Sequence, residues 1–276
     1  MKAPKISIVT PSYNQGDFIE ETILSVLNQD YDNIEYIIID GGSTDQTVDI
    51  IKKYEDRLTY WVSEKDNGQT DAINKGFAMA TGDIIAWINS DDVYCDGAFK
   101  AVQEFFQQNF YAHAVVGNGL FMNAEGEVYV RKHPNISRWL EKNAMMSVFQ
   151  PSTFLKRAIL KDSGFLNEDF QMMMDMEWFC RINRKHEFHV IDKDISKFRW
   201  HAASKSSSNH DSKLYKKFIE EKVFMLKALY PGLERWISSY PKLAFNIHNQ
   251  IGSAVRFSKR IYNWEVYKLR DTNVHH

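Results

Sequence analysis

The sequence predicts an α/β fold in which a mostly parallel central sheet is flanked by helices and followed by a helical C-terminal extension. Short apolar runs alternate with amphipathic segments over the first 97 residues. Some runs are apolar at nearly every position, as expected of strands covered on both faces. Polar clusters follow three of the runs, and ligands bind beyond the carboxyl ends of strands in such sheets. The fold class therefore also predicts where a site should lie.

The first half of the chain alternates strictly between strand and helix. Residues 34–39 are almost wholly apolar and predict a buried strand, whereas Val48, Ile51 and Tyr54 fall on one side of a helix. The same reasoning, applied in order, predicts strands at residues 6–9, 34–39, 58–62 and 84–88 and helices at residues 17–28, 44–54 and 70–80.

The alternation loosens from about residue 98. Apolar residues at helical spacing in residues 214–229 predict a long helix, and the turn at residues 124–127 separates two expected strands. The elements expected in this half are helices at residues 98–108, 175–185 and 214–229 and strands at residues 114–123, 128–132 and 187–192.

Composition restricts the class of protein. A chain of 276 residues with 44% hydrophobic content can bury a large core. Cys95 and Cys180 lie far apart and are the two cysteines of the chain, so neither a disulfide framework nor a structural zinc site is indicated. The sequence starts without a signal-peptide pattern, and no run approaches the roughly 18 apolar residues of a membrane span. A cytoplasmic protein is expected.

Two adjacent carboxylates, Asp91 and Asp92, follow the apolar run at residues 84–88. Side by side they repel each other, unless a cation lies between them and the rest of the site. Carboxylate oxygens suit Mg²⁺ or Mn²⁺, whose remaining positions are filled by phosphate oxygens and water. The alternative, an aspartate that caps the following loop, explains one of the two residues but not easily both.

Asp40 ends another buried strand and precedes two glycines, which permit a tight turn and close approach of the backbone to a ligand. Its carboxylate can accept hydrogen bonds from a nucleotide base or ribose. Alternatively, Asp40 and Ser43 merely organise a strand-to-helix turn. The sequence contains no glycine-rich dinucleotide or P-loop motif, so another charge must hold any phosphates.

Asp175 and Glu177 stand at the start of an expected amphipathic helix. Acidic residues in a first helical turn are ordinary partners of the helix dipole. The three methionines before them, however, indicate a half-buried, apolar approach, and burial makes a carboxylate a better base. His201 is a lone histidine, and such residues are more often structural.

Four stretches occur in a fixed order along the chain: "ISIVTPSYNQGDFIEETILSVLNQDY", "IIIDGGSTDQT", "GDIIAWINSDD" and "FQPSTFLKRAILKDSGFLNEDFQMMMDMEWFCRI". They resemble the first βα unit, the nucleotide-binding turn, the DxD element and the acceptor-side segment of the family 2 glycosyltransferases of GT-A fold. The resemblance is greatest to bacterial enzymes of polysaccharide and O-antigen assembly, and it covers residues 5 to about 205.

The resemblance implies roles for individual residues. Asp175 would be the general base, and Asp91 would ligate Mn²⁺ or Mg²⁺ through the donor's diphosphate, with His201 as a further metal or diphosphate contact. Gln150 and Glu177 would lie on the acceptor side. Asn89 departs from the family pattern, which often has Asp there, so it would contact ribose rather than metal. The residues implied to bind the nucleotide sugar are Thr10, Pro11, Tyr13, Asp40, Ser43, Asp71, Asn89 and Ser90.

The resemblance also implies a domain plan and a reaction. Residues 1–210 would form the catalytic domain, with a nucleotide-sugar half at residues 1–97 and an acceptor half at residues 98–210. The reaction would be inverting transfer from a UDP- or GDP-hexose, or dTDP-rhamnose, to a hydroxyl of a glycan or lipid-linked glycan. A catalytically degenerate sugar-binding scaffold is the main alternative, with Asn89 as its best support. A nucleotidylyltransferase is disfavoured because no glycine- and arginine-rich loop is found near the N-terminus.

The C-terminal extension, residues 211–276, is basic. Residues 213–276 hold 12 Lys and Arg against 5 Asp and Glu, whereas residues 1–212 hold 22 against 31. The acidic body disfavours a nucleic-acid arm. Residues 251–270 have the pattern of an irregular amphipathic helix that would contact the anionic inner face of the cell membrane, as in a peripheral protein. Packing on the catalytic domain, or on a second subunit of a homodimer, is the alternative.

Overall fold

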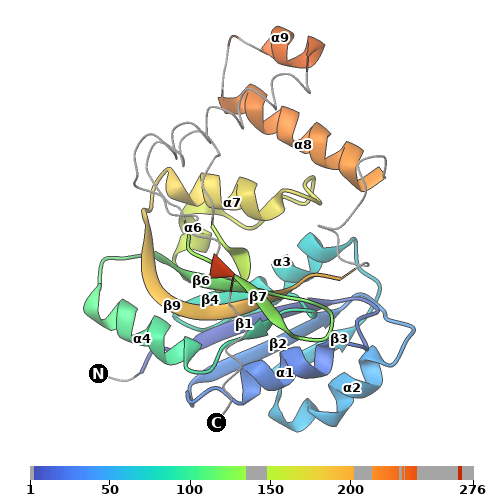
Figure 1. The fold of residues 1–276 in the computed structure, drawn as a ribbon, viewed down its shortest axis with the longest axis vertical. Coiled ribbons are helices and arrows are strands. Elements are labelled where there is room, and N and C mark those ends of the chain that lie inside the picture. The colour runs from blue at the N-terminus through green and yellow to red at the C-terminus, as the bar shows by residue number, and fades with distance from the viewer. Residues whose placement is uncertain are drawn as a thin grey trace.

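The computed structural model describes residues 3–134, 148–201, 213–229, 232, 234–240 and 267–268. The described strands form one mixed sheet with helices on both faces (Figure 1). This architecture confirms the predicted α/β class with a flanked central sheet. No helix in the described part of the chain is long and apolar enough to cross a membrane.

Four parallel strands form one half of the sheet, in the spatial order β4, β1, β2, β3. Their bounds are Ile6–Ser12 for β1, Ile34–Asp40 for β2, Tyr60–Ser63 for β3 and Ile84–Trp87 for β4. The register pairs Ser12 at the end of β1 with Asp40 at the end of β2. Their carboxyl ends therefore meet at one edge, as the positions of the polar clusters predict.

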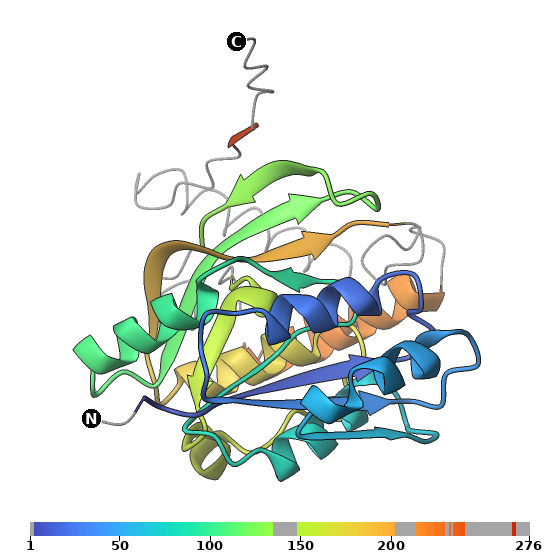
Figure 2. The ribbon, with the colours of Figure 1, turned by 90° about the horizontal axis from the view of Figure 1, so that it is seen from below.

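The other half of the sheet is largely antiparallel. β8 (Thr153–Lys156) pairs with β4 and with β6 (Ala114–Met122), and β6 pairs with β7 (Val128–Lys132). The long strand β9 (Phe188–Arg199) runs parallel to β6, is strongly curved, and pairs near its end with β5 (Val93–Tyr94) (Figure 2). The sequence predicts this strand only to residue 192. Its continuation to Arg199 brings the chain back beside the Asp91 turn.

Helices cover both faces of the sheet. One face carries α1 (Ile19–Leu27), α2 (Thr47–Lys53) and α4 (Ala98–Gln108), and the other carries α3 (Gln69–Met79), α6 (Ile159–Ser163) and α7 (Met174–Asn183). Two short 3-10 helices, η1 (Glu55–Arg57) and η2 (Gln150–Ser152), lie in the connections. The parallel strands with their helices thus form a layered platform for the loops at the carboxyl edge.

The alternation of side chains along each strand divides the core into two clusters. In β4, Ile84 and Ala86 face the α1 side, whereas Ile85 and Trp87 face the α3 side. The strands β1 and β2 divide in the same way. A strand that is apolar at both odd and even positions has two apolar faces, and both must be covered. The nearly continuous apolar runs in the sequence therefore follow from this three-layer arrangement.

The C-terminal extension begins with α8 (Lys213–Leu229), followed by α9 (Glu234–Ser239). α8 lies alongside α7 (Figure 1), and Met225 and Phe218 join the core cluster that contains Trp178 of α7. The predicted helix at residues 214–229 is confirmed. It packs directly on the helix that carries the candidate base.

The predicted amphipathic helix at residues 251–270 falls mostly outside the described residues. The two residues that are described there, Tyr267 and Lys268, form the short strand β10, which pairs antiparallel with Arg131 and Val130 of β7. The prediction of a helix is therefore wrong for these two residues, because their backbone pairs with the edge of the sheet.

Candidate active site

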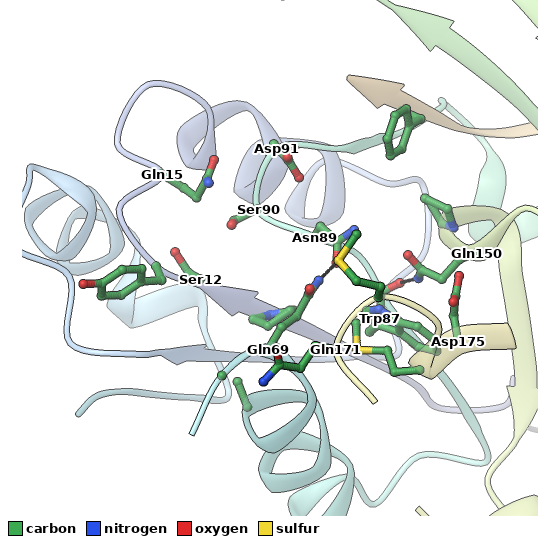
Figure 3. A pocket seen from close by; sticks show the side chains of 18 of the residues that line it. Ser12, Gln15, Gln69, Trp87, Asn89, Ser90, Asp91, Gln150, Gln171 and Asp175 are labelled. Atoms are coloured by element: carbon green, nitrogen blue, oxygen red, sulfur yellow. Dashed lines mark hydrogen bonds between the residues drawn. The ribbon is translucent and has the colours of Figure 1, made fainter. Parts of the chain in front are cut away.

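A cavity of about 850 Å³ opens at the carboxyl edge of the parallel strands (Figure 3). Each strand-end cluster supplies part of its wall: Ser12 ends β1, Gly41 follows β2, and Asn89 to Asp91 follow β4. Asp175, in the first turn of α7, lies across the cavity from Asp91 (Figure 3). The fold thus brings segments that are far apart in the sequence around one space.

Asp91, which lines this cavity, pairs with His201, which is outside the lining. The Oδ2 atom of Asp91 lies 3.0 Å from Nε2 of His201, and the two side chains are only 19% and 7% exposed. The imidazole ring also packs against Phe18, with 4.5 Å between ring centroids. The sequence places these residues 110 positions apart, and the long curved β9 is the element that joins them.

Asp92 has a different role from its neighbour. Its carboxylate is fully buried, and Oδ1 accepts a hydrogen bond of 2.9 Å from the backbone N–H of Arg199. Burial, together with the adjacent charge of Asp91, raises the pKa of Asp92 well above its usual value. The metal explanation of the adjacent pair therefore applies to Asp91 alone, because Asp92 binds the end of β9 inside the protein.

Arg199 fixes the turn that presents Asp91. Its side chain is buried and donates to the backbone oxygens of Asp91, at 3.0 Å, and Ala124, at 2.8 Å, and it forms an ion pair with Glu21. These contacts connect β9, α1 and the Asp91 turn. The sequence analysis missed Arg199, since nothing in its local pattern distinguishes it from an exposed residue at the end of a strand.

Asn89 lines the cavity, but its polar atoms already have partners. Its Oδ1 accepts from Nε2 of Gln69 at 2.7 Å (Figure 3), and its Nδ2 donates to Asp92 at 3.3 Å. Gln69 is the first residue of α3 and was also missed. Its place in the loop after β3 was the available signal, because that loop lies at the ligand-binding edge.

Asp40 lies beneath the cavity wall rather than in it. Its carboxylate accepts hydrogen bonds from the backbone N–H groups of Gly42 and Ser43 and from the hydroxyls of Ser43 and Ser63, at 2.5 to 3.1 Å. These contacts are those of a residue that organises the turn after β2. The role of Asp40 in binding the base remains a prediction, and its neighbours Ser12 and Gly41 line the cavity.

The other predicted donor-site residues divide into two groups. Pro11, Tyr13 and Ser90 line the cavity. Thr10 is buried beneath it, where its hydroxyl lies 3.1 Å from that of Tyr36. Asp71 lies outside the lining, accepts from the backbone N–H of Asn67 at 2.9 Å and pairs with Lys75, so it ties the loop before α3 to the helix. Further lining residues that the sequence analysis did not select are Ser12, Gln15, Lys65, Asp66 and Gln69.

The acceptor-side predictions also separate. Asp175 is half-buried and lines the cavity, and burial, supplemented by the charge of Glu221, raises its pKa. Gln150 lines the cavity and donates to the backbone oxygen of Trp87 at 2.8 Å. Glu177 does not line it, because its carboxylate pairs with Arg181 through hydrogen bonds of 2.9 and 2.6 Å. Of the two acids on α7, Asp175 is the one placed to act as a base.

An aromatic wall, made of Phe121, Phe149, Phe198 and Trp200, borders the cavity near Lys132. The Phe121 ring lies 5.4 Å from that of Phe149 and 5.3 Å from that of Phe198, between centroids, and Lys132 Nζ lies 3.9 Å from its centre. Trp200 is 43% exposed. The rings are tilted by 50° to 72° relative to one another, so a single exposed ring such as that of Trp200 is the surface that can stack against a sugar ring.

Two buried polar atoms of the cavity have no hydrogen-bond partner among the described residues: the hydroxyl of Ser12 and the indole N–H of Trp87. An unpaired buried polar atom costs about 1–3 kcal/mol, so such atoms in a cavity wall indicate groups that a ligand can satisfy. Neither residue was selected from the sequence. Both stand at the carboxyl ends of strands, where the fold class predicts ligand contacts.

The side chains that could ligate a metal fit a divalent cation that is also bound to phosphate better than a cation held by protein alone. The described residues contain no group of three or more His, Cys, Asp or Glu side chains arranged for a metal ion. Asp91 nevertheless lines the cavity, and its Oδ2 lies 3.0 Å from Nε2 of His201, which is not itself a lining residue. Mg²⁺ and Mn²⁺ are commonly held by one or two protein ligands and by substrate phosphates, and this pair matches that pattern.

Comparison with known proteins agrees with this geometry. The family model described as glycosyl transferase family 2 matches residues 7–181. An uncharacterized glycosyltransferase of Haemophilus influenzae is 30% identical over an alignment of 244 residues that covers 83% of this chain and 94% of its relative. The GalNAc(5)-diNAcBac-PP-undecaprenol beta-1,3-glucosyltransferase of Campylobacter jejuni is 26% identical over 231 residues, 79% of this chain and 72% of the relative.

The fold has solved counterparts. The crystal structure of S. aureus TarS 1-349 in complex with UDP-GlcNAc superposes with a TM-score of 0.64 at 19% identity, covering 94% of this chain and 76% of that TarS 1-349 chain. At that identity the likeness concerns the fold alone. Together with the sequence match over residues 7–181 and a cavity whose wall contains Asp91 and Asp175, it leads to one conclusion: the chain belongs to glycosyl transferase family 2 and is a glycosyltransferase of GT-A fold.

Proposed function

We propose that this glycosyltransferase transfers a sugar, with inversion, from a nucleoside diphosphate sugar to an acceptor hydroxyl during the synthesis of a bacterial surface polysaccharide. The main support is one observation: Asp175, with its raised pKa, lines the same cavity as Asp91, whose carboxylate pairs with His201. A base on one side and a diphosphate-binding pair on the other are what in-line displacement at an anomeric carbon requires.

Asp175 acts as the general base. Its carboxylate accepts the proton of the acceptor hydroxyl while the hydroxyl oxygen attacks the anomeric carbon. Burial raises the pKa of Asp175, and a more basic carboxylate removes this proton more effectively. General-base catalysis contributes roughly 10² to 10⁴ in rate, and positioning supplies much of the rest. Met176 N–H, which donates to Asp175 Oδ1 at 2.7 Å, orients the carboxylate.

Asp91 and His201 would hold Mn²⁺ or Mg²⁺ on the diphosphate side of the donor site. A bound cation would supply positive charge against the nucleoside diphosphate that leaves. The chain's own contribution is to keep the two ligands together, through Arg199 on the Asp91 turn and the packing of His201 on Phe18. The complexes of TarS with UDP-GlcNAc support a nucleotide sugar as the donor here.

The acceptor occupies the side of the cavity that carries the aromatic wall and Lys132. A sugar ring of the acceptor stacks on Trp200, in the same cavity as Asp175. The C. jejuni relative, whose name states a diphospho-undecaprenol-linked glycan, supports a lipid-linked acceptor. Such an acceptor is met at the cytoplasmic face of the cell membrane.

A donor screen tests the proposed reaction. The protein is incubated with UDP-, GDP- and dTDP-sugars in the presence of Mn²⁺ or Mg²⁺, and the release of nucleoside diphosphate is followed. Slow hydrolysis of one donor without acceptor is expected, because water replaces the acceptor hydroxyl at low efficiency. A scaffold would bind nucleotide without releasing diphosphate, and that outcome would contradict the proposal.

The acceptor side has its own test. Trp200→Ala should keep the rate of donor hydrolysis and lose most of the transfer to a lipid-linked or aromatic glycoside acceptor, since stacking is removed and the donor site is untouched. Tyr111→Ala is the matched control, because Tyr111 is an exposed aromatic residue that does not line the cavity. Equal loss of hydrolysis and transfer in Trp200→Ala would place its role elsewhere.

A further inference from the structure

Glu221, on α8, makes an unusual set of contacts for a carboxylate of a C-terminal extension. Only 5% of its surface is exposed. Its Oε1 accepts a hydrogen bond of 2.8 Å from the backbone N–H of Gln171, and its Oε2 accepts two of 2.9 Å from the N–H groups of Met172 and Met173. One side chain thus binds three successive backbone donors that lie about fifty residues earlier in the chain.

The segment that Glu221 binds leads directly into the candidate base. Met173 precedes the first residue of α7, and Asp175 is the second residue of that helix. Gln171 and Met172 line the same cavity as Asp175. Successive N–H groups before a helix have no partners within the helix itself. Glu221 supplies those partners, and it thereby fixes the angle at which the chain enters the first turn of α7.

α8 is held firmly enough to act as the support. Its Met225 and Phe218 belong to the core cluster shared with α7, and Phe224 packs edge-on against Phe170 at 5.7 Å between centroids. The segment is also fixed from the opposite side, where the hydroxyl of Thr70 on α3 donates to the backbone oxygen of Phe170 at 3.0 Å. The approach to Asp175 is therefore clamped between α3 and α8.

The charge of Glu221 also acts on Asp175, whose pKa it raises in addition to the larger effect of burial. The other ionisable groups around Asp175 on these two helices are Glu177, which is paired with Arg181, Cys180, and Lys222 of α8. Burial lowers the pKa of Lys222 to about 8 and raises that of Cys180 to about 12. The thiol therefore stays uncharged in the range where a carboxylate titrates.

We propose that Glu221 is a positioning residue for Asp175: it holds the backbone of residues 171–173, and its negative charge faces the carboxylate of the base. The family model ends at residue 181, so this assigns part of the catalytic arrangement to the extension beyond it. The kinetic half of the inference rests on the proposed function, whereas the structural half does not.

Hydrogen–deuterium exchange on the full-length protein tests the structural half. In Glu221→Gln, the amides of residues 171–173 should exchange at least tenfold faster than in the unmodified chain, because an amide accepts these bonds more weakly than a carboxylate. Glu220→Gln is the matched control, since Glu220 is the neighbouring exposed acid on the same helix. Unchanged exchange in Glu221→Gln would overturn the inference, whether or not the protein transfers a sugar.

Kinetics test the other half. In Glu221→Gln, kcat should fall about tenfold or more, the KM for the donor should change little, and the acidic limb of the kcat profile should move to lower pH, because a neighbouring negative charge has been removed. A merely structural role would lower kcat without moving that limb. Glu221→Asp keeps the charge but shortens the reach, so it should lower kcat while the limb stays in place.

Each outcome has a distinct meaning. If neither the unmodified chain nor any variant turns over a donor, the proposed function fails, but the result of the hydrogen–deuterium exchange still stands. If the unmodified chain is active and both Glu221 variants keep its kcat and pH profile, the positioning role is overturned. Should Glu221→Gln fail to fold, Glu221→Asp carries the test through its exchange rates and kcat.

Discussion

Asp91 and Asp92 are adjacent in the sequence and opposite in environment. Asp91 faces the cavity beside His201, whereas Asp92 is buried and bound to the backbone of Arg199. The chain turns here, with the backbone N–H of Asp92 donating to the backbone oxygen of Asn89 at 3.1 Å, and this turn leaves one carboxylate for ligand and the other for structure. The two should therefore respond differently to substitution.

Asp91→Asn should abolish most of the metal dependence of nucleotide binding and leave the fold intact. The substitution removes the negative charge that attracts the cation but preserves the size of the side chain. Calorimetric titration with UDP or GDP, with and without Mn²⁺, measures the effect. Asp96→Asn, which changes an exposed carboxylate nearby, is the control. Full metal-dependent binding by Asp91→Asn would move the cation site elsewhere.

Asp175→Asn should reduce kcat by about 10² to 10⁴ with little change in donor affinity, since an amide cannot accept the proton of the attacking hydroxyl. Glu177→Gln should be far milder, because Glu177 pairs with Arg181 and does not line the cavity. Steady-state kinetics with the donor identified by screening provide both values. A reversal of the two effects would mean that the other acid of α7 is the base.

At the scale of elements, the close approach of α3 to β1 depends on Gly76. A Cβ atom at this position would lie 2.4 Å from Cγ1 of Val9, well inside contact distance. The backbone of α3 can therefore rest on the strand only without a side chain there. This packing sets the height of α3 above the sheet and, with it, the position of Gln69 in the cavity wall.

Gly76→Ala should destabilise the protein by about 1–3 kcal/mol, the usual cost of overpacking a tight core. Adding Val9→Ala should recover part of that loss, because it removes the atoms in conflict. Urea denaturation of the single and double variants gives the comparison. Additive losses in the double variant would show that the helix does not rest on Val9.

The amino-terminal edge of the sheet contains a buried carboxylate, Glu35, on β2. It accepts hydrogen bonds from the hydroxyls of Ser7, at 2.5 Å, and Thr81, at 2.6 Å, and from the backbone N–H of Thr81, at 2.7 Å, and Lys5 lies 3.5 Å away. Burial alone would raise the pKa of Glu35, but these hydrogen bonds and the Lys5 charge lower it. The ionised carboxylate thus joins β1, β2 and the start of β4.

A lowered folded-state pKa means that Glu35 stabilises the protein above its unfolded-state pKa and that this stability is lost as pH falls through the folded-state pKa. Glu35→Gln should cost about 1–3 kcal/mol at neutral pH. Its stability should also decline less steeply toward about pH 3 than that of the unmodified chain. Urea midpoints against pH measure both effects, with the exposed Glu55→Gln as control. Parallel curves for Glu35→Gln and the unmodified chain would contradict this account.

The sequence predicted the parallel half of the sheet well because its strands are apolar at nearly every position and its helices have one apolar side. It missed β5, β8 and α6, since two to five residues carry too little periodicity. It also ended β9 seven residues early, because the second part of that strand is half-exposed and rich in charge. The length and burial of an element, rather than its position in the chain, decided whether the sequence could predict it.

The site divides in a similar way. Asp91, Asp175 and Gln150 could be placed because motifs contain them, and all three line the cavity. Arg199 and Glu221 could not, because their partners are distant in sequence: the Glu221 contacts span about fifty residues, and the Arg199 side chain reaches back more than a hundred. Long-range side-chain contacts leave no local pattern.

For the whole molecule, the extension and the catalytic core form a continuous structure at α8. The predicted boundary at residue 210 separates two stretches of sequence, yet Phe218 and Met225 of α8 share a core with α7. The predicted membrane contact of residues 251–270 lies largely outside the described residues and stays a prediction. The homodimer alternative stays a prediction as well.

The stereochemistry of the transferred sugar tests the central claim most directly, because a single displacement assisted by Asp175 inverts the anomeric carbon. The donor found by screening is incubated with the protein and an acceptor, and proton NMR follows the anomeric signal of the first product formed. The account predicts the configuration opposite to that of the donor, with formation slowed by orders of magnitude in Asp175→Asn. A product that retains the donor's configuration, or that forms at the full rate in Asp175→Asn, would contradict it.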